Sequence, residues 1–111
     1  MLRPLLVLIL AWPALARAQT DECREDVERC VEEANALVSG DEQLDRAVAL
    51  YRVACNRGSS EGCRRLGALY AIGRGVPQEL PRAATLFELA CNGGNQQGCL
   101  HLGLMQIYGR G

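Results

Sequence analysis

Apolar residues recur at helical spacing in several stretches of the chain. In "DRAVALYRVAC" (45–55) they fall at positions 47, 50, 51, 54 and 55, and in "CRRLGALYAIG" (63–73) at 63, 66, 69, 70 and 72. Spacings of three and four residues place these side chains on one stripe of each helix. A similar stripe runs through 23–38. The chain is therefore predicted to be all-α.

The helical stretches belong to an internal repeat. Residues 47–75 and 83–111 share 13 identities in 29 aligned positions, at an interval of 36 residues. A fixed period of this size is typical of a stacked-repeat solenoid. We expect an α/α superhelical solenoid of about two and a half helix–turn–helix repeats: a degenerate half unit at 20–40 and repeats at 44–75 and 80–111.

The residues between the predicted helices support this division. Gly58 and Gly94 can adopt the left-handed conformation that often follows the end of a helix. Ser59 and Asn95 come next and are good N-caps for a second helix. Pro81 fits the first turn of a helix, where its missing N–H costs little. Each repeat is therefore predicted to contain two antiparallel helices.

Two glycines lie inside the predicted second helices at equivalent positions, Gly67 and Gly103. A glycine within a helix costs roughly 1 kcal/mol relative to alanine. We therefore expect both to mark a close approach of the paired helix. The aromatic residues Tyr51, Phe87 and Tyr70 occupy core-type positions and are expected to pack rather than to bind a ligand.

The N-terminus has the pattern of a secretory signal peptide. Arg3 supplies a positive charge, an apolar run follows at 5–16, and Ala16-Arg17-Ala18 provides a cleavage site. The apolar run is shorter than the roughly 20 residues that span a bilayer. We expect residues 1–18 to be a signal peptide and 19–111 to be a mature repeat domain without a membrane span, exported to the periplasm or the extracellular space.

All six cysteines lie in the predicted mature domain. An even number of cysteines in a small exported domain favours disulfides over free thiols or metal ligands. Cys55 and Cys63 lie on either side of a predicted turn between antiparallel helices, as do Cys91 and Cys99. This arrangement brings their Cα atoms within the range of about 5.5–6 Å that a disulfide needs. Two intra-repeat disulfides are predicted.

Cys23 and Cys30 allow two interpretations. A continuous helix over 21–39 would hold the two residues roughly 10.5 Å apart, too far for a disulfide. Alternatively, Asp26 precedes Cys30 by four residues, as the N-cap Ser59 precedes Cys63, and its side chain would cap a helix that begins near Val27. In that case Cys23 and Cys30 form the same kind of bridge across a shorter turn. We favour the bridge.

The charge is distributed unevenly along the chain. Residues 21–45 contain ten acidic residues and two arginines, whereas 46–111 contain three acidic residues and eight arginines. Opposite charges on the two halves could steer a partner or promote head-to-tail association, but solvated helix faces are the simpler explanation and the one we prefer. The near-neutral total and the few aromatic residues argue against a nucleic-acid partner.

No group of residues indicates catalysis, a cofactor or a metal. The sequence has no lysine, which a serine β-lactamase needs near its nucleophile. The only histidine, His101, is equivalent to Arg65 in the preceding repeat and is expected at the helix surface. Helix ends and turns account for three serines (Ser39, Ser59 and Ser60), and solvated helix faces account for four glutamates (Glu32, Glu33, Glu61 and Glu88).

The segment "RAVALYRVACNRGSSEGCRRLGALYAIGRGVPQELPRAATLFELACNGGNQQGCLHLG" resembles the Sel-1-like repeat, a relative of the tetratricopeptide repeat. It is most similar to the cysteine-rich secreted group, in which a C-x7-C pair bridges the two helices of a unit. The resemblance covers about 30–111 and implies an adaptor surface for a protein or peptide of unknown identity. Because some members carry a penicillin-binding or β-lactamase label, a weak hydrolase is the alternative function.

The last predicted helix differs from its counterpart in the preceding repeat. The segment "GCLHLGLMQIYG" is apolar on more than one side, with Leu100 and His101 where the earlier helix has Arg64 and Arg65. Terminal units of solenoids usually carry a polar outer face. We therefore expect self-association through this helix, or a further repeat in a longer parent protein.

Overall fold

The computed structural model describes Cys23 and residues 25–109, and over this part of the chain every regular element is a helix. The five helices are α2 (Val27–Val38), α3 (Leu44–Asn56), α4 (Ser60–Ile72), α5 (Leu80–Asn92) and α6 (Gln96–Ile107). None of these helices is long and apolar enough to cross a membrane. The predicted signal peptide lies outside the described residues.

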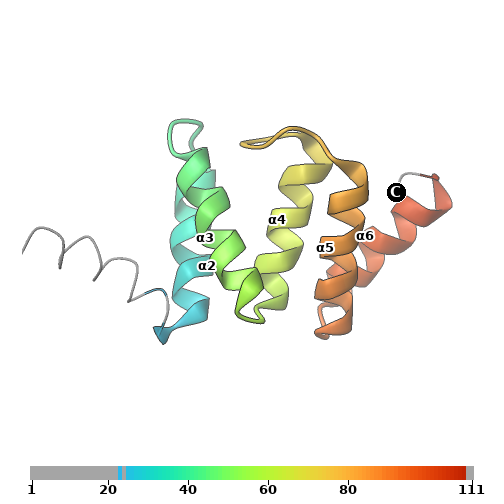
Figure 1. Ribbon diagram of the computed structural model, residues 1–111, viewed down its shortest axis with the longest axis horizontal. Coiled ribbons are helices and arrows are strands. Elements are labelled where there is room, and N and C mark those ends of the chain that lie inside the picture. Colours follow the sequence, from blue (N-terminus) through green and yellow to red (C-terminus); the bar gives the residue numbers. More distant parts are fainter. Residues whose placement is uncertain (1–22, 24, 110–111) are drawn as a thin grey trace, which may run out of the picture.

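Each helix packs against the next one along the chain. Figure 1 shows the resulting row, from α2 on the left to α6 on the right, with successive helices running in opposite directions. Helices α3 and α4 form one helix–turn–helix unit and α5 and α6 form the next, while α2 occupies the place of a second helix, with no first helix among the described residues. The predicted all-α, solenoid-like fold is confirmed.

The two units turn in the same way. Gly58 and Gly94 have positive φ angles of 97° and 93°, in the left-handed region where a side chain would be strained. The following N–H groups donate back to the ends of α3 and α5: Ser59 N to Ala54 O and Asn95 N to Ala90 O, both at 2.9 Å. These bonds satisfy carbonyl groups that the helix ends leave unpaired. The predicted turn chemistry is confirmed.

The turns bring the cysteines together in the pairs expected from the helical hairpins. Cys55 and Cys63 form a disulfide with a Cα–Cα distance of 4.5 Å. Cys91 and Cys99 form the equivalent disulfide, also with a Cα–Cα distance of 4.5 Å. Each bridge joins the end of a first helix to the first turn of a second helix and thereby closes the hairpin.

The N-terminal pair excludes a continuous helix over 21–39. The Cα atoms of Cys23 and Cys30 lie 4.9 Å apart in a third disulfide, far closer than seven residues of helix allow. Asp26 interrupts the helix with extended backbone (φ −125°, ψ 98°), and α2 begins at Val27 as expected. One detail of the prediction is wrong, because the Asp26 side chain makes no capping hydrogen bond.

The core lies between the helices and ends at α6. The three aromatic side chains expected to pack are buried, with exposed fractions of 1% for Tyr51, 2% for Phe87 and 3% for Tyr70. Each helix from α2 to α5 buries at least three residues, whereas α6 buries Gly98 alone. The apolar residues of α6 are thus arranged around a helix that packs on one side only.

Candidate functional site

The second helix of each unit begins with a capped N-terminus pressed against the first helix. The Ser59 hydroxyl accepts a hydrogen bond of 3.0 Å from Gly62 N, and Asn95 Oδ1 accepts one of 2.9 Å from Gly98 N. A Cβ on Gly62 would lie 2.8 Å from Ala54 Cβ, and one on Gly98 would lie 2.7 Å from Ala90 Cβ. No side chain fits at either glycine, so these repeated residues allow the helix pair to form.

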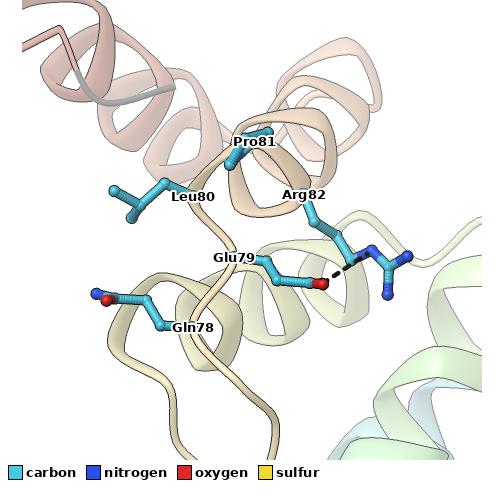
Figure 2. A pocket seen from close by; sticks show the side chains of 5 residues that line it. All are labelled: Gln78, Glu79, Leu80, Pro81 and Arg82. Atoms are coloured by element: carbon cyan, nitrogen blue, oxygen red, sulfur yellow. Dashed lines mark ion pairs between the residues drawn. The ribbon is translucent and has the colours of Figure 1, made fainter.

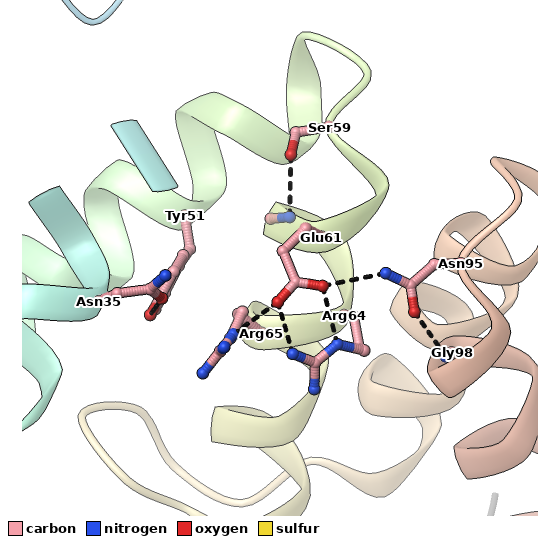
Figure 3. A network of polar contacts seen from close by, with 9 residues as sticks. Asn35, Tyr51, Ser59, Glu61, Arg64, Arg65, Asn95 and Gly98 are labelled. Carbon is pink, nitrogen blue, oxygen red and sulfur yellow. Dashed lines mark hydrogen bonds and ion pairs between the residues drawn. The ribbon is translucent and has the colours of Figure 1, made fainter. Parts of the chain in front are cut away.

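Glu61, expected to be a solvated carboxylate, is instead the centre of a polar network (Figure 3). Arg64 donates to both of its oxygens, at 3.0 and 2.5 Å, and Arg65 Nε donates at 2.8 Å. Asn95 Nδ2 of the next repeat donates at 2.9 Å. These hydrogen bonds, above all those from Arg64, outweigh partial burial and lower the pKa of Glu61 to about 2.

A second polar contact links α2 to α3. The Tyr51 hydroxyl donates a hydrogen bond of 2.5 Å to Asn35 Oδ1, also drawn in Figure 3. Burial raises the pKa of the Tyr51 phenol, and the nearby charge of Arg65 opposes that shift. Tyr51 therefore combines a core position with a polar end, which its apolar spacing in the sequence does not reveal.

Tyr70 likewise packs in the core but presents its hydroxyl to two arginines. Arg52 Nη2 of α3 donates to this oxygen at 2.7 Å, and Arg82 Nη1 of α5 donates at 3.1 Å. The Arg82 guanidinium also lies over the Tyr70 ring, 5.2 Å from its centroid. Its Nε forms an ion pair of 3.3 Å with Glu79 (Figure 2). We call Arg52, Tyr70 and Arg82 the arginine–tyrosine cluster.

Arg82 also borders a shallow hollow of about 540 Å³ at the start of α5. Figure 2 shows the residues that line this hollow: Gln78, Glu79, Leu80, Pro81 and Arg82. The guanidinium extends away from Leu80 and toward α4. Arg82 therefore belongs both to the lining of this hollow and, through its hydrogen bond to Tyr70, to the arginine–tyrosine cluster.

An apolar groove lies on another part of the surface, where α4, α5 and α6 meet. It has a volume of about 280 Å³, and its lining is almost entirely apolar: Ala68, Ala71, Ile72, Leu80, Phe87, His101, Leu104 and Met105. His101 stacks on Phe87 with a centroid separation of 5.0 Å. His101 thus lies at the surface as expected, but it is half-buried in the wall of the groove, a contact that the sequence does not reveal.

Beside the groove, α6 carries an uncovered apolar stripe. Leu100, Leu104 and Ile107 have exposed fractions of 60%, 41% and 77%. Together with Gly103 they recur at the three- and four-residue spacing of one helix face. We refer to these four residues as the α6 stripe. Soluble proteins rarely leave a contiguous apolar surface of this kind without a binding role.

The equivalent face of α4 shows what covers such a stripe. A Cβ on Gly67 would lie 3.0 Å from Phe87 Cε1 and 3.1 Å from Leu86 Cβ, because α5 packs closely there. A Cβ on Gly103, 36 residues later, would meet no atom within 4 Å. A close approach therefore occurs at Gly67, but it involves α5 of the next repeat and not the paired helix α3 as predicted; at Gly103 the prediction is wrong within the described residues.

Other residues considered for chemistry occupy structural positions. Ser39 and Ser59 flank helices and Ser60 begins α4. Across residue 23 and residues 25–109, no group of three or more histidine, cysteine, aspartate or glutamate side chains could hold a metal ion. The candidate sites are therefore the arginine–tyrosine cluster and the apolar surface of α6.

Comparison with known proteins does not assign the chain to a family. No protein-family model matches it, and neither a curated protein nor a solved structure gives a significant match. The resemblance to the Sel-1-like repeat rests on the sequence motifs alone.

Proposed function

We propose that this protein is an exported, disulfide-stapled adaptor that binds an amphipathic helix of a partner protein on the α6 stripe. The contrast between Gly67 and Gly103 carries the proposal. Both glycines occupy the same repeat position, yet one accommodates Leu86 and Phe87 of a neighbouring helix and the other meets nothing. The ligand that fits is a helix similar to α5, with a leucine and a phenylalanine side by side.

The surface of α6 suits such a partner. Helix α6 contains no aspartate, glutamate, lysine or arginine, and three side chains of its stripe are exposed. Each large apolar side chain that a partner covers contributes roughly 1.5–3 kcal/mol. Binding of an apolar helix face in a groove or against a helix is a common mode of peptide recognition. The partner then supplies the layer that α5 supplies to α4.

Three disulfides support the exported part of the proposal. Disulfides persist in oxidising compartments and are rare in the cytosol of most organisms. The described cysteines are all paired. The predicted signal peptide would direct export of the protein to the periplasm or the extracellular space. Membership of the cysteine-rich Sel-1-like group is part of this proposal and agrees with the repeat period and with the position of the bridges.

A peptide taken from the protein itself tests the proposed helix binding. A fluorescein-labelled peptide of residues 78–93, with Cys91→Ser, reproduces the helix that covers Gly67. We expect it to bind the purified, oxidised protein, and we expect Leu86→Ala with Phe87→Ala in the peptide to weaken binding at least about tenfold, given the apolar area removed. Fluorescence anisotropy measures both affinities.

Protein variants then locate the binding surface. Ile107→Glu places a charge on the α6 stripe and should abolish peptide binding, whereas Leu89→Glu, at an exposed leucine of α5, should not. Equal binding by both variants would overturn the proposal. So would a protein that ignores the peptide but forms a concentration-dependent dimer sensitive to Ile107→Glu, because a second copy would then be the ligand of α6.

A further inference from the structure

The arginine–tyrosine cluster has more hydrogen-bond donors than acceptors. A phenol oxygen offers two lone pairs and one O–H donor. In Tyr70 the two lone pairs receive Arg52 Nη2 and Arg82 Nη1. Among the described residues, the structure shows no acceptor for the Tyr70 O–H itself. Two guanidinium groups thus meet at the Tyr70 oxygen, so donors from three helices converge on one place.

The positive charge of the cluster is only partly compensated. Arg82 pairs with Glu79 through Nε at 3.3 Å. Among the described residues, no carboxylate lies at ion-pair distance from Arg52, and its guanidinium donates to the Tyr70 hydroxyl. The hydrogen bond to Tyr70, followed by the charge of Glu79, raises the pKa of Arg82 above its ordinary value. The cluster therefore holds two guanidinium groups beside a single carboxylate.

The cluster is held in place by the fold. Tyr70 is 3% exposed and fixed in the core, while Arg52 and Arg82 come from the two helices that flank α4. The two guanidinium groups that donate to the Tyr70 oxygen repel each other. A bound anion would relieve that repulsion and accept hydrogen bonds from the N–H groups that remain free. Planar guanidinium groups match the two oxygens of a carboxylate particularly well.

We propose that Arg52, Tyr70 and Arg82 form a binding site for a single carboxylate group of a peptide. Glu79 favours a carboxylate over a phosphate, because a second negative charge on the ligand would add repulsion beside a carboxylate that is already in place. The hollow at the start of α5, which Arg82 itself lines, can take the apolar residue that carries the carboxylate. This site is separate from the α6 stripe and does not depend on helix binding there.

A peptide pair that differs only at the C-terminal group provides the test. The probes are N-acetyl-tetraalanyl-leucine with a free carboxylate and the same peptide as its C-terminal amide. NMR of the arginine Nε–H groups follows the titration of the full oxidised protein. The free acid should shift the Arg52 and Arg82 signals in a saturable way, and the amide should bind at least about tenfold more weakly, since it loses charge-assisted hydrogen bonds.

Variants assign the effect to the cluster. Arg52→Gln and Tyr70→Phe should each weaken free-acid binding about fivefold to tenfold, and the second keeps the buried ring, so that the fold is preserved. Arg46→Gln removes the same charge from α3 at a different position and should leave the affinity unchanged. Equal binding of acid and amide, or equal loss in Arg46→Gln, would overturn the proposal. So would displacement by inorganic phosphate at a lower concentration than acetate.

Discussion

Asn95 donates a hydrogen bond of 2.9 Å to Glu61, a residue of the preceding repeat. The same Asn95 side chain accepts the N–H of Gly98 and thereby caps α6. One side-chain amide therefore accepts a hydrogen bond from the first turn of α6 and donates one to a carboxylate on α4. Ser59, the equivalent residue in the first unit, has only a hydroxyl and caps its own helix. Asn95 therefore links the two repeats in addition to capping its own helix.

Protonation of Glu61 should therefore destabilise the fold. Its pKa is lowered to about 2 in the folded protein, so its contribution is fully present above its ordinary range near 4.5 and is lost as the pH falls toward 2. We expect Glu61→Gln to lose about 1–2 kcal/mol at pH 7, after solvent screening, and less at pH 2.5. Urea unfolding at both pH values measures the difference.

The matched control for this experiment is Glu88→Gln on α5. Glu88 is exposed and the structure shows no ion pair for it among the described residues. Its substitution should leave the stability at pH 7 and the acid sensitivity close to those of the parent. An equal change in both variants would mean that general charge, and not the hydrogen bonds of Glu61, sets the acid sensitivity.

The two mid-helix glycines should respond differently to alanine. Gly103→Ala is predicted to stabilise the protein by roughly 1 kcal/mol, because alanine is the better helix former and no atom lies near the added methyl group. Gly67→Ala should lose that gain or destabilise, because the new Cβ would press on Phe87 at 3.0 Å. Thermal unfolding of both variants compares the effects directly. Equal stabilisation would show that α5 yields easily at Gly67.

The disulfides should differ in their resistance to reduction. Cys99 is exposed, whereas Cys63 is only 4% exposed, and their partners Cys91 and Cys55 are both half-buried. Under limiting dithiothreitol we expect Cys91–Cys99 to open before Cys55–Cys63, since thiol–disulfide exchange requires access to a sulfur. Differential alkylation followed by peptide mapping gives the order. The reverse order would show that access at the folded surface does not control the reaction.

Tyr51 supplies a prediction for the junction between α2 and α3. Tyr51→Phe removes the hydrogen bond to Asn35 and leaves a partly buried amide oxygen without that donor. The expected loss is about 1–2 kcal/mol in the free energy of unfolding. Asn35→Ala tests the same bond from the other side. If the double variant loses as much as the sum of the single variants, the two residues do not act as a pair.

Much of the fold could be predicted because the same turn and helix-capping residues recur in each repeat. The helix breaks at Asp26, Gly58 and Gly94 follow from local backbone preferences, and the disulfides follow from the hairpins that these breaks create. The side-chain roles of Glu61 and Tyr70 could not be predicted in the same way. Their partners Asn95 and Arg82 lie on other helices, and a spacing within one helix carries no information about a contact between helices.

The glycines at close helix contacts also show that spacing within one helix does not reveal contacts between helices. Gly62 and Gly98 were visible as repeated residues, but their role depends on the alanines of the facing helix, which lie eight residues earlier in the chain. The helical period instead predicts a close approach at Gly67 and Gly103, which are mid-helix. A search for small residues that face one another across the turn would have found the tighter contacts.

The turn between the helices of each unit has a consequence for how the protein can fail. Every hairpin is closed by its own disulfide at one end, whereas neighbouring hairpins are joined by noncovalent packing and by single side chains such as Asn95. Mechanical or chemical stress should therefore leave the two ends of each hairpin turn joined even after the packing between helices is lost. Reducing agents should therefore act on the stability of the single hairpins, whereas denaturants should act on the packing between them.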